Sequence, residues 1–277
     1  MPTSGQTLGA FLGTARLAWG AIALVAILGS LAVWHLRPNS WEPPPQTDAA
    51  GVPPREGPAS PFDQARRQMV DQQLRRRDIA DPRVLEAMGK VPRHLFVPER
   101  QRDQAYDDHP LPIGHDQTIS QPYIVALMTQ LAAPKPEHRA LDVGTGSGYQ
   151  AAVLSLVCKK VYGIEIVPPL AEAAQKRLAS LGYKNVTVRA GDGYRGWPEH
   201  APFDVILVAA APDHVPQPLI DQLAPGGRLV IPVGGYPQRL TVLEKRADGS
   251  IRRSTAGPVL FVPMTGEALK PGDRKQQ

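Results

Sequence analysis

Apolar residues change their spacing along this chain, and the changes predict where helices give way to strands. Between residues 63 and 88 they recur every three or four positions, which is typical of helices that bury one face. From residue 140 onward, short apolar runs alternate with amphipathic stretches. The pattern predicts helices at 63–77, 81–88, 149–158, 170–181 and 216–223, and strands at 140–143, 160–166, 186–189, 204–208 and 228–233.

Strands that alternate with helices predict a parallel sheet covered on both faces, because each crossover places a helix over the sheet. The end of the chain changes character, since strand patterns at 239–245 and 251–262 flank the hairpin dipeptide Asp248-Gly249. We therefore predict an α/β, doubly wound, Rossmann-like domain over residues 62–265 with an antiparallel C-terminal edge. A polar tail at 266–277 is expected to be frayed.

The N-terminal part carries a different pattern and is not expected to join this domain. After a tail at 1–16, residues 17–36 contain no Asp, Glu, Lys or Arg, and twenty helical residues span about 30 Å, the thickness of a bilayer core. Trp19 and Trp34 lie near the ends of this segment, where interfacial anchors occur. We predict a transmembrane anchor, with a cleaved signal segment or a buried core helix as alternatives. The proline-rich stretch 37–61 predicts an extended linker.

Charge and cysteine content limit the kinds of partner and ligand that we expect for the domain. The net charge of +5 permits an anionic partner. However, the clusters Arg66-Arg67 and Arg75-Arg76-Arg77 have no interleaved aromatic residues, so we expect a solvated helix face and no nucleic acid. The single cysteine, Cys158, lies in an apolar run and is expected to be a buried thiol. No Cys/His cluster has zinc spacing, and we predict no metal site.

The loop after the first strand of the alternating region is rich in glycine. It reads Asp142-Val143-Gly144-Thr145-Gly146-Ser147-Gly148 and stands where open α/β sheets bind ligands, at the carboxyl end of a strand. Glycine allows a ligand to approach the backbone closely at the start of a helix. The spacing is G-x-G-x-G, and Tyr149 occupies the third glycine position of the dinucleotide fingerprint, which disfavours an NAD oxidoreductase.

Acidic residues accompany this loop and the next two strands. Glu165 ends the second strand, where a carboxylate binds a ribose diol in dinucleotide folds. Asp192 and Gly193 follow the third strand, where they can offer a carboxylate and backbone groups to an adenine edge. Together these features predict an S-adenosylmethionine-dependent methyltransferase, in which Asp142 helps to position the methionine end. The predicted cofactor residues are Asp142, Gly144, Thr145, Gly146, Glu165, Asp192 and Gly193.

A polar box, Gln117-Thr118-Ile119-Ser120, precedes the apolar stretch that follows Pro122. Together with "VPRHLFVP", "LDVGTGSGYQAAVL", "GDGYRGW", "LAPGGRLVIPVG" and "VLFVPMTG", it resembles the protein-L-isoaspartate O-methyltransferase family over nearly the whole domain. The box is more discriminating than the glycine loop, which general methyltransferases also carry. By this resemblance, Ser120 is the active-site hydroxyl, and Gln117, Thr118 and Ile119 line a joint cofactor and substrate site with it.

The resemblance implies methyl transfer from S-adenosylmethionine to the α-carboxylate of L-isoaspartyl residues in damaged proteins, which initiates their repair. Two alternatives are a binding module without turnover and a methyltransferase for another carboxylate. Ser120 either serves the reaction or caps the helix at Pro122, and both roles can coexist. The chain departs from the family's pattern at Asp116, where relatives usually have a small residue, and at Ala209, where threonine is common.

The resemblance also bears on where the domain resides. S-adenosylmethionine is made in the cytosol, so we expect a catalytic domain on the cytoplasmic side of the membrane. A cleaved or inverted N-terminal segment would instead place it outside the cytosol.

Overall fold

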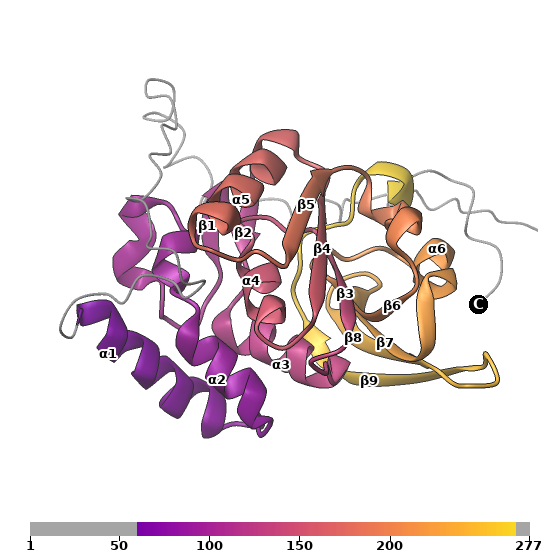
Figure 1. Cartoon of the computed structure of the whole chain (residues 1–277), viewed down its shortest axis with the longest axis horizontal. Helices are drawn as coiled ribbons and strands as arrows, with labels where there is room; N and C mark the ends of the chain where they lie inside the picture. The colour runs from indigo at the N-terminus through magenta and orange to yellow at the C-terminus, as the bar shows by residue number, and fades with distance from the viewer. Residues whose placement is uncertain (1–59, 270–277) are drawn as a thin grey trace, which may run out of the picture. The chain divides into compact units, whose positions relative to one another are not determined.

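The computed structural model describes residues 60–269, which form a seven-stranded sheet with helices packed on it, and a separate small hairpin (Figure 1). The strand order is β5-β4-β3-β6-β7-β8-β9. Strands β3 to β7 pair in parallel. β8 pairs antiparallel with β7 on one side and with β9 on the other. The predicted α/β fold with an antiparallel edge is confirmed. The strands of this sheet are β3 (Arg139–Val143), β4 (Lys160–Glu165), β5 (Val186–Ala190), β6 (Phe203–Val208), β7 (Leu223–Val233), β8 (Gln238–Lys245) and β9 (Ile251–Val259).

The helices begin where their sequences supply caps or prolines. Asp81 accepts a hydrogen bond from the Arg83 amide at 2.9 Å, and Pro82 opens the helix that follows. The predicted helix at 63–77 is present, but it changes to π-helical geometry at Met69. The helices are α1 (Pro61–Gln68), η1 (Met69–Arg75), α2 (Pro82–Lys90), η2 (Arg93–Phe96), η3 (Glu99–Gln104), α3 (Pro122–Ala132), α4 (Tyr149–Ser155), α5 (Pro168–Ser180), η4 (Gly193–Arg195), η5 (Pro198–His200), α6 (Gln217–Asp221) and η6 (Gly266–Leu269).

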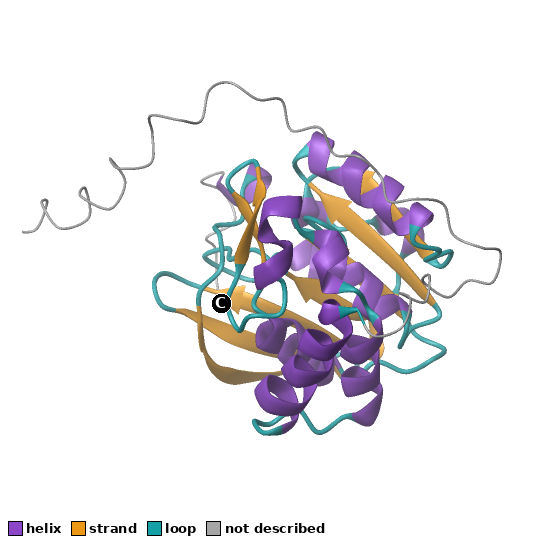
Figure 2. Cartoon of the chain, turned by 90° about the vertical axis from the view of Figure 1, so that its left-hand side faces the viewer, coloured by secondary structure: helices purple, strands orange, loops and turns teal. Residues whose placement is uncertain are grey.

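The sheet separates two hydrophobic clusters, because successive residues of a strand point to opposite faces. Ala140 and Leu207 face the cluster that includes α3, α4 and α5. Leu141 and Ile206 face the other cluster, which contains η4 and α6. Figure 2 shows the helices and the sheet from the side of the N-terminal helices. Asp142 lies on the same face as Ala140, so the alternation directs a carboxylate toward the buried helices.

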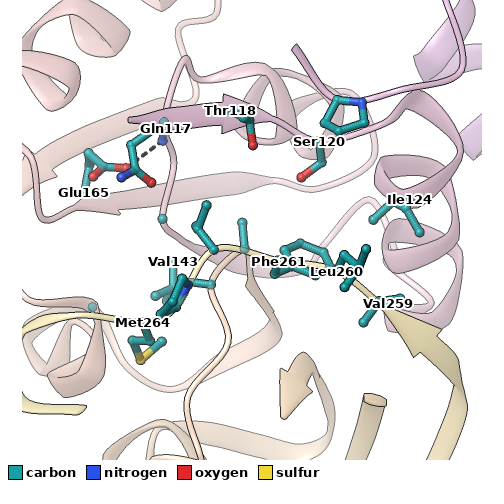
Figure 3. A pocket seen from close by; sticks show the side chains of 18 of the residues that line it. Gln117, Thr118, Ser120, Ile124, Val143, Glu165, Val259, Leu260, Phe261 and Met264 are labelled. Carbon is teal, nitrogen blue, oxygen red and sulfur yellow. Dashed lines mark hydrogen bonds between the residues drawn. The ribbon is translucent and has the colours of Figure 1, made fainter. Parts of the chain in front are cut away.

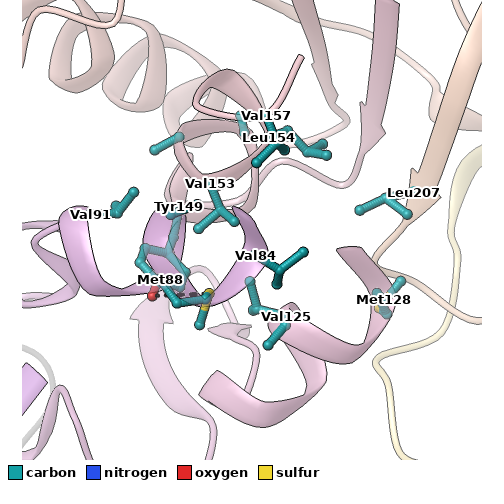
Figure 4. Packing of buried hydrophobic residues seen from close by; sticks show 14 of the residues in the cluster. Val84, Met88, Val91, Val125, Met128, Tyr149, Val153, Leu154, Val157 and Leu207 are labelled. Carbon is teal, nitrogen blue, oxygen red and sulfur yellow. Dashed lines mark hydrogen bonds between the residues drawn. The ribbon is translucent and has the colours of Figure 1, made fainter. Parts of the chain in front are cut away.

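The N-terminal helices form a layer that supports α3 and α4. Met88 of α2 and Val125 of α3 are at most 2% exposed and pack in one cluster with Tyr149 and Val153 of α4 (Figure 4). The Tyr149 hydroxyl donates to Met88 Sδ at 3.8 Å. This layer fixes the position of α3, and therefore of the polar box immediately before it.

The strand order reverses at β3, which lies between β4 and β6. The chain moves outward from β3 through β4 to β5 and then returns to β6 on the other side of β3. Loops that leave adjacent strands in opposite directions create a crevice at the carboxyl end of the sheet. The Ala209 amide donates to the Val143 carbonyl at 2.8 Å, so the two strand ends stay together at this point.

Several predicted boundaries are wrong, each for a backbone reason. The hairpin of β1 (Leu111–Gly114) and β2 (Gln117–Ile119) was not predicted, because its strands are short and its turn residues His115 and Asp116 adopt positive φ without being glycine. The predicted helix at 216–223 ends at Asp221, and β7 already begins at Leu223. Pro225-Gly226-Gly227 lies inside this strand, where the register with β6 is irregular. The predicted helix at 149–158 ends at Ser155.

The C-terminal end also differs from the prediction. The strand predicted at 251–262 ends at Val259, after an irregular pairing with β8. Gly266–Leu269, at the start of the predicted polar tail, forms the 3-10 helix η6, and residues 270–277 lie outside the described residues. Cys158 is buried, as predicted, and burial raises the pKa of its thiol to about 12.

No helix within residues 60–269 is long and apolar enough to cross a bilayer. The predicted transmembrane segment at 17–36 and all but the last two residues of the predicted linker lie outside the described residues.

Truncation of Leu154 in α4 should test the helix–sheet core. Its side chain is fully buried, so we expect Leu154→Ala to lower the free energy of unfolding by about 2–5 kcal/mol. Leu156, one residue beyond the same helix, is 43% exposed and provides the control, with an expected loss below about 1 kcal/mol. Urea unfolding of both variants measures the difference, and equal losses would contradict the packing described above.

Candidate active site

A cavity of about 820 Å³ lies at the crevice where the strand order reverses. Figure 3 shows Glu165 and Gln117 toward one end and Ile124, Leu260 and Val259 toward the other, with Ser120 between. The cavity therefore joins the end of β4 to the start of α3. Eight of the predicted site residues line it: Gln117, Thr118, Ser120, Gly144, Gly146, Glu165, Asp192 and Gly193.

A second cavity of about 30 Å³ adjoins the first on the face of the sheet that α3 and α4 cover. The three remaining predicted residues, Ile119, Asp142 and Thr145, line only this smaller space. Ser120 and Ala209 border both cavities. Ile119 is 5% exposed and packs in the core, so it borders the smaller space and not the main cavity.

Glu165 fixes the glycine loop from the end of β4. Its Oε2 accepts a hydrogen bond from the Gly146 amide at 2.8 Å, and its Oε1 accepts one from the Val167 amide at 3.0 Å. The side chain is 5% exposed, yet it borders the main cavity. Because each carboxylate oxygen carries two lone pairs, both oxygens retain an acceptor site for a hydroxyl group of a ligand.

The glycine loop turns so that its backbone faces the cavity. Gly144 and Gly146 both have positive φ, 79° and 53°, which other residues rarely adopt. The Gly144 amide donates to the Ile164 carbonyl at 2.9 Å and ties the loop to β4. The loop thus brings bare backbone beside Glu165.

Asp142 is a fully buried carboxylate. Neither of its side-chain oxygens has a hydrogen-bond partner within residues 60–269. Burial raises the pKa of Asp142 to about 7; the neighbouring Thr145 opposes this rise and the nearby charge of Glu165 contributes to it. The ionised form of a buried carboxylate without hydrogen bonds is strongly stabilised when a cation or a hydrogen-bond donor binds in the adjoining space.

Asp192 lines the main cavity and also holds two backbone segments in place. Its Oδ1 accepts from the Tyr194 amide at 3.0 Å and caps η4, and its Oδ2 accepts from the Glu267 amide at 2.8 Å, which holds the C-terminal segment to the end of β5. Each oxygen retains a lone pair, so the contact of this carboxylate with an adenine edge stays a prediction. Gly193 stays close to Val143, since an added Cβ would lie 2.4 Å from Val143 Cγ1.

The polar box lies in the hairpin strand β2 and the turn that follows it. Ile119 pairs with Leu111 of β1 and points into the core, which leaves the half-buried Ser120 at the cavity wall. Helix α3 begins at Pro122, and its N-cap is Gln121, without a side-chain capping bond. The alternative in which Ser120 caps this helix is therefore wrong.

The two departures from the family pattern fall in different places. Asp116 lies at the exposed tip of the β1–β2 turn with a φ of 56°, and it lines neither cavity. Asp is among the residues that tolerate this backbone conformation. Ala209 borders both cavities, so its small side chain enlarges the space beside Asp142 and Ser120.

The roof of the main cavity consists of residues 258–265, which the sequence did not predict as part of the site. The Phe261 amide donates to Gln238 Oε1 at 2.9 Å, and the Ala211 amide donates to the Val262 carbonyl at 2.8 Å. The Met264 amide donates to the Ala211 carbonyl at 2.9 Å, so the segment runs back over β6. The available signal was Pro258 and Pro263, which cannot donate in a strand ladder and bracket the apolar run.

Arg77 was also missed, because its cluster was interpreted as a solvated helix face. Its guanidinium lies over the ring of Tyr123, 3.5 Å from the centroid, and pairs with Asp108 at 3.0 Å. The Tyr123 hydroxyl donates to Asp78 at 2.7 Å. Arg77 and Tyr123 both line the cavity, so this network forms part of its wall near the start of α3.

Comparisons with known proteins agree on one family. The model of the protein-L-isoaspartate(D-aspartate) O-methyltransferase family matches residues 64–269. A protein-L-isoaspartate O-methyltransferase of a Synechococcus strain is 59% identical over 227 residues, which is 78% of this chain and 93% of that protein. Its counterpart in Gloeobacter violaceus is 57% identical over 201 residues, 72% of this chain and 98% of that protein.

Solved structures give the same result. A protein-L-isoaspartate O-methyltransferase matches 73% of this chain and 67% of its own with a TM-score of 0.67 and 29% identity. A Plasmodium falciparum protein, described as such an enzyme and solved with S-adenosyl-L-homocysteine, matches 72% of this chain and 98% of its own. Its TM-score is 0.64 and its identity is 28%.

The buried carboxylate of Asp142 should make stability depend on pH. Its pKa in the folded chain, about 7, lies above the unfolded value of about 4, so folding favours the protonated form. Without ligand, this group should therefore lower the free energy of unfolding by about 1.4 kcal/mol per unit as the pH rises from about 4 to 7. Urea unfolding of the wild type and of Asp142→Asn at pH 5.5 and 7 measures the contribution. Parallel pH dependence in the two proteins would contradict the assignment.

Proposed function

This chain belongs to the protein-L-isoaspartate(D-aspartate) O-methyltransferase family, and on that premise we propose that it methylates the α-carboxylate of L-isoaspartyl residues in damaged proteins, with S-adenosylmethionine as the methyl donor. The observation that carries the proposal is one cavity that connects Glu165 and the glycine loop to Ser120. A cofactor site and an acceptor site thus share the same enclosed space.

The residues at the β4 end fit the cofactor. Glu165 retains acceptor sites for a ribose diol, and Gly146 leaves the backbone open beside it. The unpartnered Asp142 carboxylate suits the cationic amino group of the methionine end. When bound, S-adenosylmethionine supplies a methyl group on a positively charged sulfur, which a nucleophile can attack directly.

The acceptor needs no general base, because a carboxylate is already ionised at neutral pH. None of the residues that line the cavity is a histidine or a lysine. Ser120 supplies a neutral hydroxyl that can orient the acceptor without binding it as tightly as an arginine pair would. The acceptor oxygen forms a bond to the methyl carbon while the carbon–sulfur bond breaks toward sulfur, so no proton moves.

The roof favours this chemistry by excluding water. Val259 and Phe261 present apolar side chains on the roof, and Ile124 lies across from them on α3 (Figure 3). An anion and a cation become a neutral ester and a neutral thioether, so a site of low polarity favours the transfer. Alignment of the two reactants at van der Waals contact supplies the remainder of the rate enhancement.

The product ester connects the reaction to repair. By family resemblance, the ester cyclises without the enzyme to a succinimide, and hydrolysis returns part of it to normal aspartate. Two other readings differ from this proposal in their products: a binding module would form no ester, and a methyltransferase for another carboxylate would not discriminate isoaspartyl from aspartyl linkages.

We further propose that residues 17–36 tether the domain to a membrane on its cytoplasmic side. The support is the uncharged apolar run and the cytosolic origin of the methyl donor. A reporter that is active only outside the cytosol, fused at the C-terminus, should stay inactive. Reporter activity would place the domain outside the cytosol.

Two matched peptides test the activity. We expect the full chain to transfer label from methyl-labelled S-adenosylmethionine to an isoaspartyl peptide as a base-labile ester. A peptide of the same sequence with a normal aspartyl linkage should take up no label. Equal labelling of both peptides would favour another carboxylate as the acceptor, and cofactor binding without any labelling would favour the binding module.

Substitutions at the two ends of the cavity should separate binding from turnover. Ser120→Ala should lower kcat by about 10-fold to 100-fold and leave cofactor affinity within about twofold, because the hydroxyl serves the acceptor. Glu165→Gln should weaken cofactor binding by about tenfold, since an amide is a poorer partner for two hydroxyl groups. Calorimetric titration with S-adenosylhomocysteine and steady-state rates measure both effects. An unchanged affinity in Glu165→Gln would refute its ribose role.

A further inference from the structure

The outer side of the cavity roof carries an unexplained apolar surface. Leu260 is 67% exposed although it also lines the cavity, and Tyr236 is 84% exposed in the loop between β7 and β8. Exposed apolar side chains that gather beside a binding site mark interaction surfaces more often than scattered ones do. Leu260 lies toward the Ile124 end of the site, away from Glu165 (Figure 3).

Tyr236 lies in the loop that enters β8 beside the roof. Gln238, two residues after Tyr236, pairs with Val259, which immediately precedes Leu260. The side chain of Gln238 bonds both backbone groups of Phe261, at 2.9 and 3.1 Å, and holds the two segments together. Tyr236 is therefore two residues, and Leu260 one residue, from the point where β8 is bonded to the roof.

The loop that carries Tyr236 lies in open space. A Cβ added at Gly234 or Gly235 would meet nothing within 4 Å. The base of the loop is fixed, because the Gly234 amide donates to the Pro212 carbonyl at 2.9 Å. An aromatic side chain on an exposed loop with a fixed base is accessible to a ligand that approaches the roof.

Strand β9 ends at the roof of the cavity, and within residues 60–269 the backbone along its outer edge is free to pair with another chain. It is the terminal strand of the seven-stranded sheet, and no described strand pairs with its outer side. Every residue from Ile251 to Ala256 is exposed. The charged residues Arg252 and Arg253, which discourage strand pairing, lie at the far end, and Ser254–Ala256 nearer the cavity are uncharged.

We propose that an extended segment of the damaged protein, adjacent to its isoaspartyl residue, docks along the outer edge of β9 and packs an apolar side chain on Tyr236 and Leu260. We call Tyr236, Leu260 and this edge of β9 the docking face. The inference rests on the proposed function, which makes the acceptor a polypeptide. An extended chain suits such an edge, because main-chain hydrogen bonds bind any sequence and one apolar contact adds affinity. The face is continuous with the cavity through Pro258 and Val259, which line it.

The test compares a long and a short acceptor with the full chain. The long acceptor is a capped 12-residue peptide with a central isoaspartyl residue and apolar neighbours, and the short one is a capped isoaspartyl tripeptide. We expect Tyr236→Ser to raise KM for the 12-residue peptide about tenfold, and to change kcat and the KM for the tripeptide less than twofold. Tyr236→Phe should retain the wild-type KM, because the contact depends on the apolar ring.

A control lies at the other end of the molecule. Leu156 is 43% exposed and follows the C-terminal end of α4, which starts at the site and runs away from it. Leu156→Ser should leave both KM values unchanged. An unchanged KM for the 12-residue peptide in Tyr236→Ser, or an equal rise for both acceptors, would overturn the docking face.

Binding measurements separate this inference from the proposed function. A fluorescent 12-residue peptide is titrated with the full chain in the presence of S-adenosylhomocysteine, so the readout does not require methyl transfer. N-methylation of one alternating set of amides in the flanking segment should weaken binding about tenfold, and the other set should have little effect. If neither set weakens binding, or if Tyr236→Ser binds the parent peptide as the wild type does, the docking face is wrong. If the wild type binds the peptide but methylates no acceptor, the proposed function fails and the docking result stands on its own.

Discussion

The position of β3 between β4 and β6 is the constraint on which the site depends. The chain leaves β3 toward β4 and leaves the adjacent β6 toward β7 on the other side, so the two following loops diverge and the crevice between them becomes the cavity. The glycine loop and Ala209 follow these two strands and face each other across the crevice. Glu165, at the end of β4, completes the arrangement by binding the Gly146 amide. The rest of the fold either supports this centre or covers it.

The cover comes from the end of the chain. Residues 258–265 pass over the cavity and bond to Gln238, Ala211 and, through Glu267, to Asp192. These anchors lie on β8, after β6 and after β5. A segment held at three places can enclose reactants and exclude water without a large core of its own. The same anchoring explains why Asp192, an acid beside a cofactor loop, serves the backbone of the roof.

Two acids on adjacent strands thus have contrasting environments. Glu165 is satisfied by backbone amides and still borders the main cavity. Asp142 faces the side of the sheet that α3 and α4 cover. Its side-chain oxygens have no hydrogen-bond partner among the described residues, and burial raises its pKa to about 7. Desolvation disfavours the charged form of any group, so only a bound cation or donor stabilises the Asp142 carboxylate at neutral pH. Binding at the site and ionisation of Asp142 are therefore coupled.

The amino-acid sequence by itself determined the alternation of strands and helices, the glycine loop, the acid at the end of β4 and the polar box with Ser120. These features are local, because periodicity, turn chemistry and short motifs depend on neighbours within a few residues. Only the tertiary structure decided that Arg77 and residues 258–265 line the cavity, that Ile119 and Asp142 face the smaller one, and that the loop with Tyr236 enters β8 where Gln238 binds the roof. Those placements depend on contacts between segments tens to hundreds of residues apart, such as the bond from Glu267 to Asp192. Spacing along the chain carries no information about such contacts, since loops and strand register set them only once the sheet is assembled.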